Sequence, residues 1–218
     1  MITVYGVYRS RALRVFWLLE EANAVFAHVP VIQSYRLDHP TAEDAPLNTA
    51  SPAFRAVNPL GQVPALRDGD LLLSESLAIC LHLARRTGGN LGPMTPQEEA
   101  LMEQWALFAA TSVEPAAIEI LYTYRDKQAD TPTGAGILRI AAEKLKRPLH
   151  RLEVALEGKD WLLDRFSVAD IMVEECLRYA AGYGPLLQEF PNVAKWMSAC
   201  QSREGFQKVW AARNAEPE

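Results

Sequence analysis

The segment Gly61–Ile79, with the sequence GQVPALRDGDLLLSESLAI, contains the signals of a hairpin and of a helix start. An Asp-Gly turn at 68–70 separates apolar runs at 64–67 and 71–73, which is a strong hairpin pattern. From Ser74 the pattern becomes helical, because serine is a preferred N-cap and basic residues occupy the expected last turn. The segment therefore predicts two antiparallel strands followed by a helix that begins at Ser74.

Both ends of this segment carry groups that suit a peptide-like ligand. Pro64 opens a strand, and a cis Val63–Pro64 bond would turn the Val63 N–H and C=O outward for pairing with a peptide. A trans proline at a strand edge is the alternative. Glu75 and Ser76 fall in the expected first helical turn, where N–H groups favour a carboxylate, so they fit an amino-acid head. Alternatively, Ser74 caps the helix and Glu75 only complements its dipole.

The residues before this segment predict a strand, a helix and a second strand. Residues 2–7 alternate β-branched and aromatic side chains, which is typical of a strand. Ser10 precedes apolar residues at helical spacing, so we expect a helix that begins at Ser10. Residues 24–32 predict a second strand, and residues 34–59 predict irregular structure with one short helical turn.

The rest of the chain predicts a separate helical domain. Residues 88–95 are rich in glycine and proline and form the expected linker, and Thr95-Pro96 then opens a helix. The expected helices cover roughly 96–126, 134–157, 167–181, 191–201 and 204–213. We therefore predict a mixed α/β domain at 1–87 and an all-helical domain at 96–218.

Composition and charge exclude several classes of function. The chain has 218 residues, of which 49% are hydrophobic, and a net charge of −5. Residues 1–88 are neutral in sum, so residues 89–218 carry the whole acidic excess, and an acidic chain without a basic stripe argues against nucleic-acid binding. No apolar run is long enough to span a bilayer, and the N-terminus lacks a signal-peptide pattern, so no membrane partner is expected.

Cysteine and histidine usage predicts neither a disulfide nor a metal site. Cys80, Cys176 and Cys200 are far apart and show no C-x-x-C spacing, so we expect three buried helical thiols in a reducing cytoplasm. The four histidines are scattered without ligand spacing on a helix, which argues against a metal.

Taken together, the motifs resemble those of the cytosolic-type glutathione S-transferases over nearly the whole chain. The residues NPLGQVPAL at 58–66, followed by SESLAI at 74–79, are similar to the family's glutathione-binding segment, in which a cis-proline follows the residue that pairs with the cysteinyl backbone. The residues GKDWLLDRFSVADIMV at 158–173 resemble the family's buried helix start, where Ser167 and Asp170 fit a capping box.

The resemblance implies a fold, a reaction and a set of ligand contacts. The fold would be a thioredoxin-like domain followed by an all-helical domain, assembled as a homodimer. The reaction would conjugate the glutathione thiolate to small hydrophobic electrophiles, with hydroperoxide reduction as a side activity and glutathione as co-substrate, without a metal or other cofactor. The residues implied in glutathione binding are Gln62, Val63, Pro64, Glu75, Ser76 and, across the dimer interface, Glu103. A solvated helix face is the alternative for Glu103.

Two hydroxyl groups compete for stabilising the thiolate. A free thiol with a pKa near 8.5 is only about 3% ionised at pH 7, and lowering that pKa by two units requires about 2.7 kcal/mol. By resemblance, Ser10 matches the serine of theta-like classes and the cysteine of the bacterial beta class, whereas Tyr5 matches the activating tyrosine of the alpha, mu and pi classes. Arg14, four residues after Ser10, favours a bacterial serine-type enzyme, so we expect Ser10 to act.

Further residues are candidates for catalysis and for electrophile binding. Arg11 would place a cation in the first turn of the expected helix, which is unfavourable unless an anion such as the thiolate answers it; a solvated surface arginine is the alternative. The candidates for the electrophile pocket are Tyr8, Phe108, Thr111 and Ser112. An aromatic stripe with the spacing of Trp105 and Phe108 is also typical of a core.

Two rival functions use the same fold. A non-catalytic carrier of glutathione or of another ligand, or a partner-recognition module, is possible because fold does not determine function. A glutathione-dependent disulfide reductase is disfavoured because Ser10 stands where such enzymes carry a cysteine nucleophile.

Overall fold

The computed structural model describes residues 1–87 and 89–217, and its contacts divide them into two compact units. Unit 1 contains Met1–Gly89 together with the residues from Glu204 onward, and unit 2 contains Asn90–Arg203. The sequence-based scheme assigned every residue after 95 to the helical domain, whereas the last helix packs within unit 1. Residue 88 of the expected linker lies outside the described residues, and residues Gly89–Leu91 form a short 3-10 helix, η2.

Unit 1 is built on a four-stranded sheet with the order β2-β1-β3-β4. The strands are β1 (Ile2–Tyr5), β2 (Phe26–Val29), β3 (Ala65–Asp68) and β4 (Leu71–Leu73). Strand β1 pairs in parallel with β2 and antiparallel with β3, and β3 and β4 form the expected hairpin. This order and these directions confirm the thioredoxin-like prediction.

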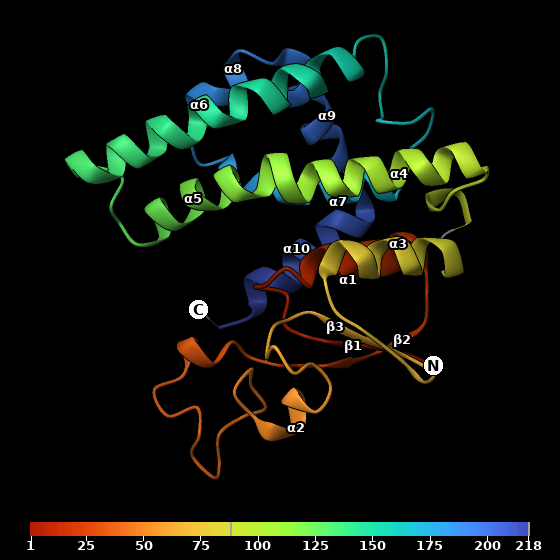
Figure 1. The fold of residues 1–218 in the computed structure, drawn as a ribbon, viewed down its shortest axis with the longest axis vertical. Coiled ribbons are helices and arrows are strands. Elements are labelled where there is room, and N and C mark those ends of the chain that lie inside the picture. Colours follow the sequence, from red (N-terminus) through yellow and green to blue (C-terminus); the bar gives the residue numbers. More distant parts are fainter. Residues whose placement is uncertain (88, 218) are drawn as a thin grey trace. The chain divides into compact units, whose positions relative to one another are not determined.

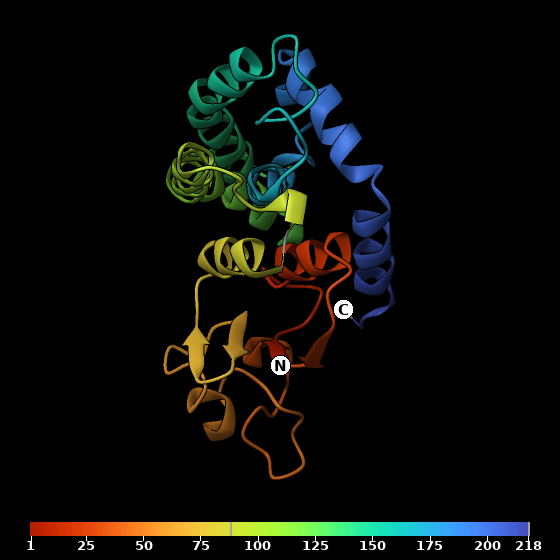
Figure 2. The same cartoon turned by 90° about the vertical axis from the view of Figure 1, so that its right-hand side faces the viewer.

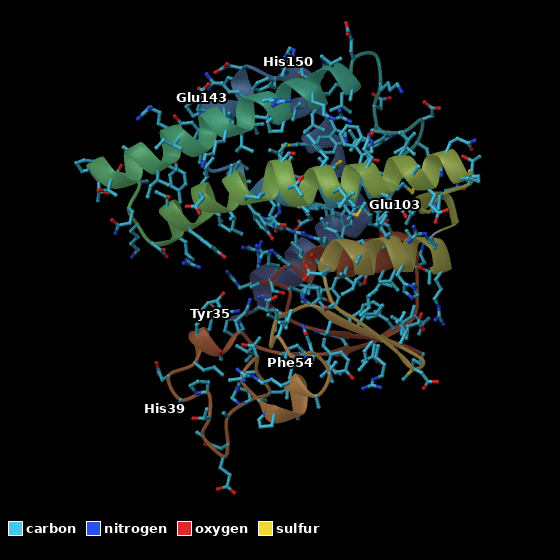
Figure 3. All side chains as sticks on the ribbon, viewed as in Figure 1. Tyr35, His39, Phe54, Glu103, Glu143 and His150 are labelled. Carbon is cyan, nitrogen blue, oxygen red and sulfur yellow. The ribbon has the colours of Figure 1, made fainter. Side chains whose placement is uncertain are left out.

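Helices cover both faces of the sheet (Figure 1). The helices of unit 1 are α1 (Leu13–Glu21), η1 (Ser34–Arg36), α2 (Pro52–Arg55), α3 (Ser76–Thr87) and α10 (Glu204–Ala215). Figure 2 shows α10 (dark blue) next to α1 (red), where the Phe206 ring meets the buried Trp17 ring edge-on with centroids 5.1 Å apart. On the opposite face, Phe54 of α2 packs with Val31 and Ala65 (Figure 3).

The first strand is shorter than predicted, and the first helix starts later. The expected strand covered 2–7, but β1 ends at Tyr5 because the chain turns at Gly6, whose φ is +151°. A Cβ at Gly6 would lie 2.9 Å from the Cβ of Ala12, so only glycine permits this close approach. The prediction that the helix begins at Ser10 is wrong, since α1 begins at Leu13 and Ser10 lies in the preceding turn.

The start of α3 also differs from the prediction. The sequence indicated Ser74 as the N-cap, but α3 begins at Ser76 and Glu75 has a left-handed backbone with φ +67°. A non-glycine residue in this region costs about 1–3 kcal/mol and is typical of functional sites. Glu75 therefore does not lie in the first helical turn, although its carbonyl still accepts the N–H of Ile79 at 2.9 Å.

A buried asparagine organises the long segment between β2 and α2. The Asn48 side chain is fully buried, and its amide nitrogen donates to the carbonyls of Pro40 and Pro46 at 2.8 and 2.9 Å. Its amide oxygen accepts the N–H of Ala50 at 2.9 Å. The segment therefore has a defined path despite its irregular backbone, and it carries the short helices η1 and α2 in the predicted region.

Unit 2 is helical, as predicted. Its elements are η2 (Gly89–Leu91, which begins at the edge of unit 1), α4 (Pro96–Phe108), η3 (Ala109–Val113), α5 (Glu114–Arg125), α6 (Pro132–Ala155), α7 (Val168–Leu177), η4 (Arg178–Ala180), α8 (Gly184–Gln188) and α9 (Pro191–Gln201). The single helix expected over 96–126 is interrupted by η3, a π-helical turn. Pro115 explains the interruption, because it has no N–H for the carbonyl of Thr111 and its ring crowds that carbonyl.

The predicted capping box of α7 is present. The Ser167 side chain accepts from the first turn of the helix, and the Asp170 carboxylate accepts the Ser167 N–H at 2.9 Å. The other Asp170 oxygen accepts the N–H of Leu162 and the indole N–H of Trp196, both at 2.9 Å. One carboxylate therefore joins the start of α7 to the preceding loop and to α9.

Three further features of the described residues concern membrane-spanning helices, metal-ligand clusters and the cysteines. Within residues 1–87 and 89–217, no helix is both long enough and apolar enough to cross a bilayer. Over the same residues, no group of three or more His, Cys, Asp or Glu side chains could hold a metal ion. Cys80, Cys176 and Cys200 are all buried thiols, as predicted.

Candidate functional site

Ser10 lies in the turn that joins β1 to α1 and is partly buried. The hydroxyl donates to the Val7 carbonyl at 2.6 Å and accepts the N–H of Ala12 at 3.0 Å. A hydroxyl has one proton, so donation to a ligand requires it to leave the Val7 carbonyl. The contact with Ala12 can persist after that rotation, and it would keep the oxygen in place.

The Val63–Pro64 peptide bond is cis, which confirms the expectation for this turn. Val63 packs partly against the Phe54 core of unit 1, and its Cβ lies 3.5 Å from the Cβ that Gly6 lacks. The turn is therefore held beside the end of β1, close to the residues that lead to Ser10. Gln62, the preceding candidate, is exposed.

Asn58 supports this turn and was not identified from the sequence. Its buried side chain donates to the Gln62 carbonyl at 2.7 Å and accepts the N–H of Leu60 at 3.2 Å. An asparagine that bonds its own neighbouring backbone is a common turn signal, so the pattern N-P-L-G contained this information.

Ser76 and Glu75 form the other end of the candidate site. Ser76 is buried at the start of α3, whereas the Glu75 side chain is exposed to solvent. The guanidinium of Arg14 donates to the Ser76 hydroxyl oxygen at 3.2 Å. Because Arg14 supplies the donor in this contact, the Ser76 proton can be donated to a ligand.

Arg14, which in the sequence only favoured the serine type, is fully buried in α1. A charged residue within the apolar run LRVFWLL was the available signal, because buried arginines are normally paired or hydrogen-bonded. Its contact with Ser76 joins the helix that follows the Ser10 turn to the helix that follows Glu75.

Tyr5 and Arg11 are the other two candidates for catalysis, and their catalytic roles stay predictions. The Tyr5 ring packs against Phe54, with ring centroids 6.3 Å apart, and belongs to the small core between the sheet and α2. Tyr5 is therefore a half-buried aromatic residue of strand β1. Arg11 is exposed and precedes α1, so it does not place a cation in the first turn of that helix as expected.

Tyr8 borders the Ser10 turn in unit 1. Its ring packs against the tilted Phe16 ring with centroids 4.4 Å apart and meets His28 edge-on at 5.5 Å. Burial, together with the carboxylates of Glu20 and Glu216, raises the pKa of the Tyr8 phenol. The phenol therefore stays protonated at neutral pH and can only act as a neutral hydrogen-bond partner.

The remaining candidates belong to unit 2. Glu103 is exposed on α4 (Figure 3), and Thr111 and Ser112 are exposed in the η3 turn. Phe108 meets Trp105 edge-on at 5.3 Å, and the Arg151 guanidinium lies 5.5 Å from its ring centroid. A π-turn is frequent at functional sites, which is consistent with a ligand role for Thr111 and Ser112. That role, and the one expected for Glu103, stay predictions.

Comparisons with known proteins decide the family. The model of the glutathione S-transferase N-terminal domain matches residues 8–86, and the model of the C-terminal domain matches residues 114–204. Glutathione S-transferase 1 of Zea mays is 34% identical over 220 residues, covering 95% of each chain. The chain belongs to the glutathione S-transferase family.

Solved glutathione transferases have the same fold as this family member. Glutathione transferase F2 from Populus trichocarpa is 27% identical, with a TM-score of 0.81 over 99% of this chain and 100% of its own. Glutathione S-transferase-I, solved with the ligand lactoylglutathione, is 31% identical, with a TM-score of 0.79 over 97% of this chain and 99% of its own. The expected fold and enzyme class are confirmed, whereas the bacterial theta- or beta-like subclass stays a prediction.

Proposed function

We propose that this glutathione S-transferase conjugates the glutathione thiolate to small hydrophobic electrophiles, with Ser10 stabilising the thiolate. The observation that carries the proposal is the grouping of Ser10, the cis Val63–Pro64 turn and Ser76 within one compact unit. The rings of Tyr5 and Phe54 pack together in the core, which favours the serine over the tyrosine. Reduction of hydroperoxides by the same thiolate is part of the proposal.

The backbone of Val63 and the residues at the start of α3 would hold glutathione. The Val63 N–H and C=O would pair with the cysteinyl backbone as an added strand does. The Ser76 hydroxyl, with Arg14 donating to its oxygen, would donate to the carboxylate of the γ-glutamyl head. The exposed Glu75 carboxylate would accept from the ammonium of that head.

The hydrogen bond from Ser10 alone does not supply the free energy needed to lower the thiol pKa by two units. A hydrogen bond to a thiolate contributes about 1.5–3 kcal/mol, but the bond to Val7 that is given up is worth about 1 kcal/mol. The difference falls short of the roughly 2.7 kcal/mol that lowers a pKa by two units. The nearby start of α1 adds about 0.3–1 kcal/mol for an anion, which brings the sum close to the requirement.

The ultraviolet absorbance of the bound thiolate, titrated against pH, tests the proposal. We expect the thiolate band of the wild type and of Tyr5→Phe to titrate below pH 7, and that of Ser10→Ala to be lost. Loss of the band only in Tyr5→Phe would transfer the role to the tyrosine. A wild type that binds glutathione without a thiolate band would instead be a carrier, and disulfide turnover would indicate a reductase.

The serine-type subclass, the homodimer and the cytoplasmic location also remain proposals. The names of the relatives support a glutathione transferase, and the homodimer follows from the family resemblance of the sequence. Light scattering at several protein concentrations tests the dimer directly. Within it, Glu103 would reach the glutathione of the partner, so Glu103→Ala should weaken glutathione binding only in the dimer.

A further inference from the structure

The C-terminal tail contacts the turn that carries Ser10. Both oxygens of the Glu216 carboxylate accept backbone hydrogen bonds, one from the N–H of Tyr8 and one from the N–H of Arg9, each at 2.8 Å. The Arg9 side chain returns to the tail, because its Nε donates to the Glu216 carbonyl at 3.1 Å. Hydrogen bonds to an ionised carboxylate are shorter and roughly twice as strong as neutral ones, so this contact restrains the turn firmly.

A second set of hydrogen bonds joins the tail to the segment that follows β2. The Gln33 side-chain amide donates to the Arg9 carbonyl at 3.0 Å, and Arg36 donates to the Gln33 side-chain oxygen at 3.2 Å. The other terminal nitrogen of Arg36 donates to the Pro217 carbonyl. The turn, the η1 segment and the tail are therefore joined in a ring of hydrogen bonds, to which the tail contributes Glu216 and Pro217.

The packing of helix α10 against α1 fixes the position of this tail. Its Phe206 ring packs on the buried Trp17 ring, and a Cβ on Gly205 would lie 2.8 Å from the Glu21 carboxyl carbon, so α10 lies close against α1. The Glu216 N–H also donates to the Arg213 carbonyl at 3.3 Å. Because the tail continues directly from a packed helix, little conformational entropy is lost when Glu216 meets the turn.

We infer that Glu216 is a positioning residue for Ser10, an inference that rests on the proposed function. The Ser10 hydroxyl must leave the Val7 carbonyl to donate to the thiolate, and this removes a hydrogen bond that shapes its own turn. The Glu216 carboxylate is independent of that bond, so it holds the backbone of Tyr8 and Arg9 while the hydroxyl rotates. The tail thereby keeps the Ser10 oxygen aimed at the sulfur.

The thiol pKa of bound glutathione, measured in Glu216→Ala, tests this inference. We expect the pKa to rise by about one unit, which is a tenfold loss of thiolate at a pH below that pKa. The kcat should fall with the thiolate while the KM for glutathione changes little, and Glu216→Gln, which keeps an acceptor oxygen, should recover part of the loss. Glu204→Ala removes an equal charge from an exposed position of α10 and should behave as the wild type.

A purely electrostatic effect of Glu216 predicts the opposite sign. Removing a negative charge near a thiolate would lower the thiol pKa, so an unchanged or lowered pKa in Glu216→Ala overturns the inference. A pKa that rises equally in Glu204→Ala would also overturn it, because that result would trace the effect to net charge or to α10.

Amide hydrogen exchange in the ligand-free protein separates this inference from the proposed role of Ser10. The Tyr8 and Arg9 amides should exchange faster in Glu216→Ala and at the wild-type rate in Ser10→Ala. Unchanged exchange in Glu216→Ala would overturn the inference even if Ser10 proves essential. If Ser10→Ala keeps the wild-type thiol pKa, the proposed role of Ser10 fails, and the assignment of Glu216 to Ser10 fails with it, whatever the exchange rates show.

Discussion

Substituting Asp170 by alanine should destabilise unit 2 more than removal of an ordinary surface carboxylate. The side chain is fully buried, and its two oxygens accept three N–H groups at 2.9 Å, from Leu162, Ser167 and Trp196. A buried donor left without a partner costs about 1–3 kcal/mol, and a lost helix cap about 1 kcal/mol. Allowing for relaxation of the loop, we expect a loss of about 3–5 kcal/mol in the free energy of unfolding.

Urea unfolding followed by far-ultraviolet circular dichroism measures this loss. Protein concentration must be held constant, because assembly would add to the apparent stability. Asp164→Ala is the matched control, since the Asp164 side chain is 97% exposed and lies 3.7 Å from Lys159, and it should change stability by less than about 0.5 kcal/mol. A loss below about 1 kcal/mol in Asp170→Ala would refute the assignment of three unmet donors to this carboxylate.

The pH dependence of the same variant gives a second, signed test. Burial outweighs the hydrogen bonds from Leu162, Trp196 and Ser167 and raises the pKa of Asp170 to about 6. In the unfolded chain it is about 3.9, so between these values the folded protein binds more protons and loses stability as the pH rises. The cost of Asp170→Ala should therefore be larger near pH 4 than at pH 7, whereas a cost that grows towards pH 7 would show that the carboxylate is stabilised in its ionised form.

Two further predictions concern buried or paired charges. Arg14→Met removes the donor to the Ser76 hydroxyl oxygen, so the affinity for glutathione, measured by calorimetry, should fall about tenfold, which is the effect of one hydrogen bond. Unchanged affinity in a folded variant would contradict a role of this contact in glutathione binding. The hydrogen bonds from Arg165 and from the Met94 N–H lower the pKa of Glu98 to about 2, so the stability that Glu98 contributes is present above the unfolded pKa near 4.3 and is lost as the pH falls towards 2. The stability difference between wild type and Glu98→Gln in urea titrations should shrink over that range, and a difference independent of pH would contradict the ion pair.

Features set by adjacent residues could be predicted from the sequence. The β3–β4 hairpin follows from an Asp-Gly turn between apolar runs, and the capping box of Ser167 follows from spacing alone. The cis proline turn and the position of Ser76 required the additional resemblance of the surrounding motif. These features share one property, which is that the decisive contacts lie within a few residues of each other.

Other features did not follow from the local sequence patterns. The start of α1 moved from Ser10 to Leu13 because the Ser10 hydroxyl bonds the Val7 carbonyl and the Ala12 N–H, closing a turn where a helix cap was expected. Glu75 adopts a left-handed backbone that its residue type disfavours. The carboxylate of Glu216 reaches residues more than two hundred positions earlier, and no local pattern encodes that contact.

The position of α10 changes how the domain that carries the candidate glutathione site should be defined. A boundary near residue 88 would leave the sheet with α1, α2 and α3, and it would uncover the Trp17 ring that Phe206 now covers. It would also remove Glu216 from the turn that carries Ser10. The folding of α1 and the geometry of the candidate thiol site therefore depend on residues at both ends of the sequence, and unit 2 is an insertion between them.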